Sequence, residues 1–263
     1  MDANPRDVRA LCHLGITLLR IEHPAQARDR FREAHDLDTT WFPAALGLGA
    51  AMRFVDRGVL AGLRDLPEEG ALGTIPGLEQ LVPDWDALTP SERRVVQVSA
   101  WPLRSVVPTL AEAGATFRIL PLDVRPSDLR EFSDLPGIEP HERTPDAAAG
   151  LARPEIAVAR IEDLLDTVTD HSWVFAHELA HLSLWAMPEE AQRDVIRLWH
   201  AVQEMPWVVG NYQASNPHEF FAVGYEGWLR RRYKRKNAPL RDEEGVADTI
   251  DGWFDALLAT GAP

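Results

Sequence analysis

The segment His177-Glu178-Leu179-Ala180-His181 combines residue types and a spacing that can do metal chemistry. Residues four apart on a helix share one face, with Cβ atoms about 5–6 Å apart. Both imidazoles can therefore reach one metal ion at roughly 2.0–2.1 Å. Glu178 is turned by about 100° from His177, which places its carboxylate beside the metal, where it can take a proton from water. The pattern H-E-x-x-H therefore predicts metal-assisted hydrolysis.

The surrounding sequence predicts that this segment lies on a buried helix. Apolar residues recur at helical spacing around the histidines, namely Trp173, Val174, Leu182, Leu184 and Trp185. Thr169 or Asp170 can cap the helix N-terminus, and Pro188 marks its end. The polar groups of a buried helix must be satisfied, either by a metal ion or by hydrogen bonds within an ordinary core. The sequence context favours the metal.

A catalytic zinc site needs a third protein ligand and one open position. The downstream candidates are His200, Glu204, His218, Glu219, Glu226 and Asp248. His200 and Glu204 lie outside the apolar face of their predicted helix, which is typical of surface residues. Glu219 follows a capping Asn216 and a Pro217 that suits a first helical turn. A carboxylate in this largely apolar helix needs a charge partner, so Glu219 is the favoured third ligand.

Glu226 lies seven residues after Glu219 and therefore on the same face of the predicted helix. It can accept the ring N–H of a ligand histidine and hold that ring in orientation.

The run Arg230 to Lys236 follows directly and is strongly basic. It could bind an acidic substrate or lipid headgroups, but a solvated helix end is favoured because cations offset the helix dipole there. A last amphipathic helix is predicted after Pro239.

Composition excludes several function classes. The chain has 263 residues, with 27 Lys and Arg against 41 Asp and Glu, for a net charge of −14. An anionic surface argues against a nucleic-acid partner. Cys12 is the single cysteine, so no intrachain disulfide is possible. No segment has the pattern of a secretion signal or of a membrane span, and we expect a cytoplasmic protein.

The first 55 residues predict helices, with a break at His23-Pro24. Their pattern consists of Leu11, Leu14, Gly15 and Leu18, then Ala27, Phe31 and Ala34, and the Leu14-Gly15 pair recurs 34 residues later as Leu48-Gly49. This resembles one and a half tetratricopeptide repeats. Since about three repeats are normally needed for stability, the segment must dock on the rest of the chain or on a protein partner. The alternative is an ordinary helical hairpin.

Residues 56–90 are rich in Pro, Gly and acidic groups and predict a connector with at most short helices. A second domain, 91–263, is predicted to begin with a strand over 93–101, a helix over 102–114 ended by Gly114, and a strand over 116–124. Such a unit forms a parallel pair by right-handed crossover. Residues 125–152 are predicted to be irregular, and a third strand is predicted over 154–165, leading into the metal-site helix. This loop and an edge strand are expected to line a cleft and pair with an extended peptide, unless the loop is simply surface.

The motifs together resemble a known family. H-E-x-x-H with a later glutamate in an E-F-F-A segment, and Tyr212 seven residues before Glu219, is similar to the gluzincin metallopeptidases, most closely those like the anthrax lethal factor catalytic domain and the MtfA-type peptidases. The resemblance covers roughly 94–257. One departure is Val223, where the family has an acidic residue, and Glu226 is our substitute for it.

The resemblance implies an α+β fold: a zincin-like metallopeptidase domain with a small sheet, preceded by the small all-α segment. It implies one Zn²⁺ held by His177, His181 and Glu219, with Glu178 as general base and Tyr212 as a transition-state donor. The expected activity is hydrolysis of peptide bonds in a protein or peptide substrate. Two alternatives remain: an inactive zincin-fold scaffold that binds proteins, and a non-haem iron enzyme with two histidines and one carboxylate.

Overall fold

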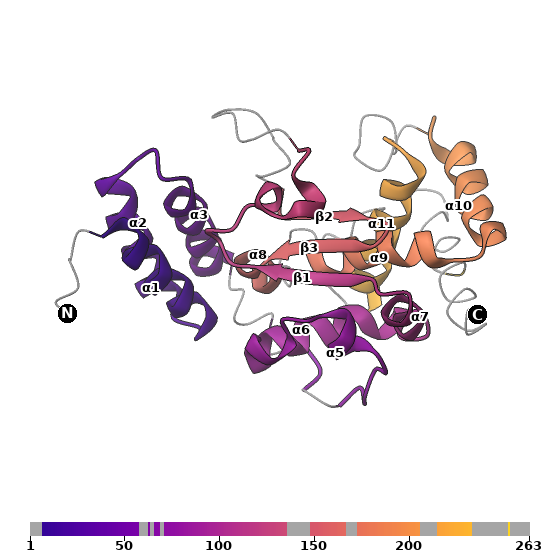
Figure 1. Cartoon of the computed structure of the whole chain (residues 1–263), viewed down its shortest axis with the longest axis horizontal. Coiled ribbons are helices and arrows are strands. Elements are labelled where there is room, and N and C mark those ends of the chain that lie inside the picture. Colours follow the sequence, from indigo (N-terminus) through magenta and orange to yellow (C-terminus); the bar gives the residue numbers. More distant parts are fainter. Residues whose placement is uncertain are drawn as a thin grey trace.

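The protein has a mixed α+β architecture in which a small sheet is surrounded by helices (Figure 1). The computed structural model describes residues 7–57, 63, 66–68, 71–135, 148–166, 173–205, 215–232 and 252. Helices α1–α3 lie at one end of the sheet, and α10 and α11 lie at the other. Among the described residues, the larger of two hydrophobic clusters extends from α1 to α11, and the smaller one consists of Leu120, Phe132, Ile156 and Val158.

Three helices form the N-terminal layer, namely α1 (Val8–Arg20), α2 (Pro24–Leu37) and α3 (Phe42–Arg57). Asp7 caps α1 through the N–H groups of Arg9 and Ala10, and Pro24 opens α2 after the predicted break. The ring of Phe31 fills the space beside Gly15 and Gly47, because a Cβ at either glycine would collide with it. In the predicted repeat, Gly49 is the equivalent of Gly15, because it lies 34 residues later in the sequence. In the structure, however, Gly47 and not Gly49 contacts the Phe31 ring. The repeat resemblance stays a prediction.

The N-terminal layer docks on the rest of the chain, which is one of the two outcomes that the sequence predicted. Arg20 of α1 makes a two-pronged ion pair with Glu92, at 2.8 and 2.9 Å. Glu92 is completely buried. Arg53 of α3 pairs with Asp163 at 2.9 Å. Two ion pairs and a shared core therefore fix this layer in place.

Within 56–90 the described helices are short, as predicted: α5 (Leu78–Leu81) and η1 (Trp85–Ala87). Their apolar side chains are part of the core. The division of the chain at this stretch stays a prediction.

The predicted strand over 93–101 is wrong, because α6 (Pro90–Ala100) occupies this stretch. Thr89 and Glu92 form a capping box at its start, an arrangement that stabilises a helix N-terminus. The β-branched residues of the stretch resemble a strand, but Val95, Val96 and Val98 are all buried on a helix within the core. Burial in the tertiary structure thus outweighs intrinsic strand propensity.

The next helical segments are η2 (Trp101–Leu103) and α7 (Val107–Glu112). Gly114 follows α7 with a φ of +80°, a left-handed conformation that glycine adopts without strain. The prediction of a helix that ends at Gly114 is confirmed.

The sheet has three strands in the order β1-β3-β2: β1 (Thr116–Leu120), β2 (Gly150–Arg153) and β3 (Ile156–Arg160). The strand predicted over 116–124 is confirmed at β1, and the first half of the strand predicted over 154–165 is confirmed at β3, whereas its second half forms the helix α8 (Ile161–Asp166). β1 and β3 pair in parallel with Thr116 opposite Ile156. The parallel pair therefore joins these two strands rather than 93–101 with 116–124. β2 pairs antiparallel with β3 and begins within the stretch 125–152 that was predicted as irregular. The described part of this stretch also contains η3 (Pro126–Asp128) and η4 (Arg130–Phe132).

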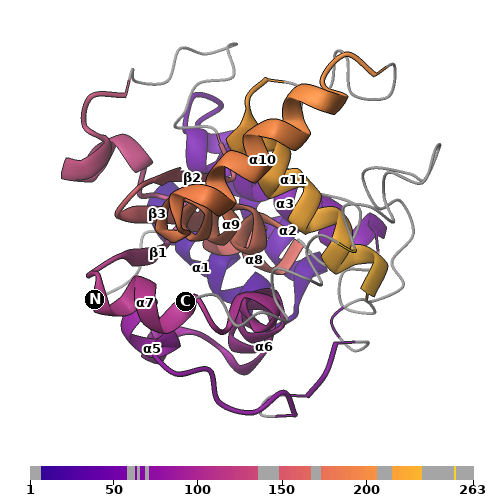
Figure 2. The ribbon, with the colours of Figure 1, turned by 90° about the vertical axis from the view of Figure 1, so that its right-hand side faces the viewer.

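The remaining helices are α8 (Ile161–Asp166), α9 (Val174–Ala186), α10 (Glu189–Val202) and α11 (Pro217–Arg232). Figure 2 shows α10 and α11 at the end of the molecule opposite the N-terminal layer. Nearly every side chain of α9 is buried. The predicted caps Thr169 and Asp170, the last helix after Pro239 and most of the basic run lie outside the described residues. No helix in the described ranges combines the length and apolar character needed to cross a membrane.

Candidate metal centre

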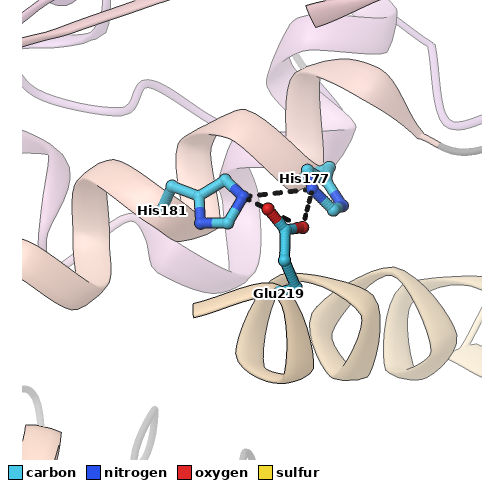
Figure 3. A group of neighbouring side chains, drawn as sticks. All are labelled: His177, His181 and Glu219. Carbon is cyan, nitrogen blue, oxygen red and sulfur yellow. Dashed lines mark hydrogen bonds and ion pairs between the residues drawn. The ribbon is translucent and has the colours of Figure 1, made fainter. Parts of the chain in front are cut away.

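His177 and His181 on α9 and Glu219 on α11 point toward one another (Figure 3). The two helices pack side by side, and all three side chains are buried or half-buried. Among the described residues, these three form the one group of metal-ligand side chains close enough to hold an ion. The structure therefore brings together the three ligands that the sequence predicted.

The separations between the three ligand atoms suit a tetrahedral ion. His177 Nε2 lies 3.1 Å from Glu219 Oε2 and 3.1 Å from His181 Nε2. His181 Nε2 lies 3.6 Å from Glu219 Oε2. Tetrahedral ligands at roughly 2.0–2.1 Å from zinc lie about 3.3 Å from one another. The donor set and its spacing therefore fit Zn²⁺.

Glu226 holds both the His177 ring and the start of α9. Its Oε1 lies 2.7 Å from His177 Nδ1, and its Oε2 accepts the backbone N–H of Trp173 at 3.2 Å. An N–H on Nδ1 that donates to a carboxylate leaves Nε2 free to bind a metal and fixes the orientation of the ring. The geometry matches the role that the sequence predicted for Glu226. Val223, at the position of the family's acidic residue, is buried in α11.

Asn216 positions Glu219 by capping α11. Its side-chain oxygen accepts the backbone N–H groups of His218 and Glu219, at 2.9 and 3.0 Å. The cap predicted at Asn216 is confirmed. Because two N–H groups anchor the first turn, the Glu219 side chain leaves the helix at a fixed point opposite the imidazoles.

Glu178 is buried, with 6% of its surface exposed. The pKa of its carboxyl is raised to about 8, chiefly by burial and then by the charges of Glu219 and Glu226, while His177 lowers it. A carboxyl whose pKa lies near neutrality is suited to accept and return a proton.

The electrostatics of His177 and Glu219 favour a cation between them. Burial alone would lower the pKa of His177, but its hydrogen bonds with Glu219 and Glu226 and the nearby carboxylates raise that pKa well above its usual value. For Glu219, burial opposes the charged form, but hydrogen bonds with His177 and His181 bring the pKa of this carboxyl well below its usual range. Protons and metal ions compete for such ligands, and surroundings that hold a proton also attract a divalent cation.

A pocket opens over the three ligands. It is lined by Gly150, Leu151 and Ala152 of β2, by His177, Glu178, His181 and Trp185 of α9, and by Asn216, His218 and Glu219. The edge strand that lines the pocket is β2, whereas the sequence predicted the strand that leads into α9. The site is thus a solvent-connected cleft with a strand along one side.

The sequence did not predict that Trp185 and His218 line the pocket. The rings of Trp185 and His218 lie 5.2 Å apart between centroids. His218 was one of the candidate ligands, but its ring centroid lies 6.5 Å from that of His181, and it is not part of the ligand group. Burial lowers the pKa of His218, and the nearby His181 lowers it further. Both residues line the pocket wall.

The other candidates are elsewhere or outside the described residues. His200 lies on α10 with its ring nitrogen 3.0 Å from the Gln203 amide, and Glu204 follows the same helix. Tyr212 and Asp248 lie outside the described residues. The transition-state role of Tyr212 therefore stays a prediction.

Comparisons of the chain with protein-family models, with curated proteins and with solved structures each found no match.

Proposed function

We propose that this protein is a zinc-dependent peptidase that hydrolyses peptide bonds in a protein or peptide substrate. The observation that carries the proposal is the meeting of His177 Nε2, His181 Nε2 and Glu219 Oε2 within 3.1–3.6 Å of one another, beside a buried glutamate in an open pocket. Two imidazoles and one carboxylate with an open position are the ligand set of a hydrolytic zinc site.

When bound, Zn²⁺ supplies a Lewis acid that polarises the scissile carbonyl and makes water more acidic. Glu178 takes the proton of the attacking water and passes it to the leaving amine. Glu226 keeps the His177 ring oriented, and Asn216 keeps Glu219 in place through the α11 cap. The family resemblance assigns Tyr212 the hydrogen bond to the developing oxyanion.

The position of β2 supports the proposal that the substrate is a peptide. Within the described residues this strand pairs with β3 on one side, so the backbone groups of its other edge are available to an extended segment. Gly150, Leu151 and Ala152 of the same strand line the metal-site pocket. A peptide added along this edge would pass over the metal ligands. A role of the N-terminal helices in binding a protein partner stays a prediction.

The same ligands also describe a non-haem iron site, in which two histidines and a carboxylate leave open positions for oxygen. Glu178 favours hydrolysis, because a buried carboxylate at the pocket is a proton acceptor that oxygen chemistry does not require. An inactive scaffold does not require it either. The identity of the metal separates these functions.

Metal analysis of protein purified without added metal tests the proposal first. We expect one equivalent of zinc in the wild type and none in His177→Ala. His200→Ala is a matched control, because His200 is exposed on α10. One equivalent of iron would favour oxygen chemistry, and no metal would favour a scaffold.

Cleavage of a fluorogenic peptide library tests the reaction. Glu178→Gln should keep its zinc and lose about 10²–10⁴-fold in turnover, the usual contribution of a general base. A Glu178→Gln protein with full activity would remove Glu178 from the mechanism. The absence of cleavage by a zinc-loaded wild type across the library would count against the peptidase.

A further inference from the structure

Gly150 of β2 lies directly against Glu178 of α9, and both residues line the metal-site pocket. We propose that Gly150 is a positioning residue, whose missing side chain leaves the space in which the Glu178 carboxylate is held. This inference rests on the proposed function, because it concerns the placement of the general base.

The space beside Gly150 is too small for a methyl group. A Cβ built on Gly150 would lie 2.7 Å from Glu178 Cγ, 2.7 Å from Glu178 Oε1 and 2.7 Å from Val174 Cγ1. Carbon atoms in contact prefer separations of about 3.5–4.0 Å. Even alanine at this position would therefore force a neighbour to move.

The surroundings determine which neighbour moves. Gly150 itself is held in the sheet, where it pairs with Ala159 of β3. Val174 is β-branched and belongs to the helix α9. The χ1 angle of such a residue has one strongly preferred value in a helix, so its side chain resists displacement. Glu178 has three rotatable side-chain bonds and borders an open pocket. A methyl group at position 150 would therefore displace the Glu178 side chain into the pocket.

Packing is the main restraint on Glu178 in the described part of the chain. The described residues give its carboxylate no hydrogen bond, and the shifts of its pKa come from burial and from nearby charges. The side chain is nonetheless buried. With β2 on one side and the α9 backbone on the other, the contact with Gly150 fixes how far the carboxylate lies from His177 and Glu219.

A stability cycle tests this contact without metal or turnover. Gly150→Ala is made in the wild type and in Glu178→Ala, and the Tm of each protein is measured in EDTA. We expect Gly150→Ala to lower the Tm of the wild type by about 5 °C, since overpacking costs a few kcal/mol at most. In Glu178→Ala, which lacks Cγ and the carboxylate, the fall should be at most half as large. Equal falls in the two backgrounds would overturn the proposal.

Gly49→Ala is the matched control. Within the described residues, a Cβ on Gly49 of α3 would meet only Arg53, at 3.7 Å, so the Tm of the Gly49→Ala protein should not fall. A fall for Gly49→Ala as large as that for Gly150→Ala would mean that the effect is not specific to the pocket.

Kinetics test the positioning role. Gly150→Ala should keep one equivalent of zinc and lose at least tenfold in kcat, with a smaller change in KM, because a displaced base affects the chemical step more than substrate binding. An unchanged kcat would overturn the proposal. If the wild type binds zinc but cleaves no peptide, the proposed function fails, while the stability cycle still decides whether Gly150 positions Glu178.

Discussion

Buried acidic side chains have different kinds of partner at two places in this protein. At the contact between α1 and α6, Glu92 is fully buried and receives both prongs of the Arg20 guanidinium. It also accepts the backbone N–H of Thr89 at 2.7 Å. Between α9 and α11, the ion pairs of Glu219 and Glu226 are with histidine.

The difference separates a structural cluster from the proposed metal site. A carboxylate paired with a guanidinium and hydrogen-bonded to the backbone is satisfied by the chain's own groups. Imidazoles are weaker partners, because they carry a full charge only when protonated. Glu178, Glu219 and Glu226 gather around two histidines, and the charges of Glu219 and Glu226 help to raise the pKa of the Glu178 carboxyl. A bound cation would stabilise the charged forms of these carboxyl groups.

The largest effect is expected at the structural cluster. Glu92→Ala leaves Arg20 without its partner, and we expect a loss of about 2–4 kcal/mol in the free energy of unfolding, somewhat less than for a fully buried pair because Arg20 is partly exposed. Urea denaturation measures it. Zinc content should stay at one equivalent, and a parallel loss of zinc would show that the two clusters are not independent.

Glu226→Ala tests the proposed metal site. It removes the hydrogen-bond partner of His177 Nδ1 and of the Trp173 N–H. We expect zinc affinity to fall by about 10–100-fold, equivalent to about 1.4–2.7 kcal/mol. Competition with a fluorescent chelator measures it, and Glu226→Gln, which keeps an acceptor, should lose less. Unchanged affinity in both variants would exclude Glu226 from the site.

Glu162 on α8 differs from both Glu92 and Glu219. Both of its carboxylate oxygens are buried without a hydrogen-bond partner in the described residues. Burial, and then the charge of Asp163, raise the pKa of Glu162 from 4.5 to about 8, while Arg160 lowers it. Folding thus favours the protonated form. The stabilisation that comes from protonated Glu162 is fully present below pH 4.5, and it is lost as the pH rises through about 8.

We therefore expect the free energy of unfolding to fall by on the order of 1 kcal/mol between pH 7 and 9 through Glu162 alone. Glu162→Gln should lack this part of the pH dependence. Chemical denaturation of both proteins across this range measures the difference, in which contributions shared by both proteins cancel. Equal slopes for the two proteins would contradict the expectation.

The fold was predictable from sequence where local patterns agree with the tertiary structure. The break at Pro24, the helix end at Gly114 and the strands β1 and β3 are confirmed. The error at α6 arose because its valines resemble a strand, although Thr89 and Glu92 already carried the capping-box pattern of a helix start. β2 was missed because Gly150–Arg153 has little strand propensity and forms through its pairing with β3.

The candidate site was predictable to the extent that helical spacing fixes it. His181 follows His177 by four positions, and Glu226 follows Glu219 by seven, so each pair shares a helix face. The contact of Gly150 with Glu178 depends on how β2 packs on α9, and no local pattern encodes such a distance. The positions of Trp185 and His218 in the pocket wall depend in the same way on the packing of α9 against α11.

The ligand set also has a consequence for protein synthesis. His177 and Glu219 are 42 residues apart in sequence, and a chain is made from its N-terminus onward. A nascent chain that already contains β2 and α9 still lacks Glu219 and Glu226. The proposed ligand set can therefore be complete only after α11 has left the ribosome. The order of the elements along the chain thus prevents the proposed activity from arising before α11 has packed against α9.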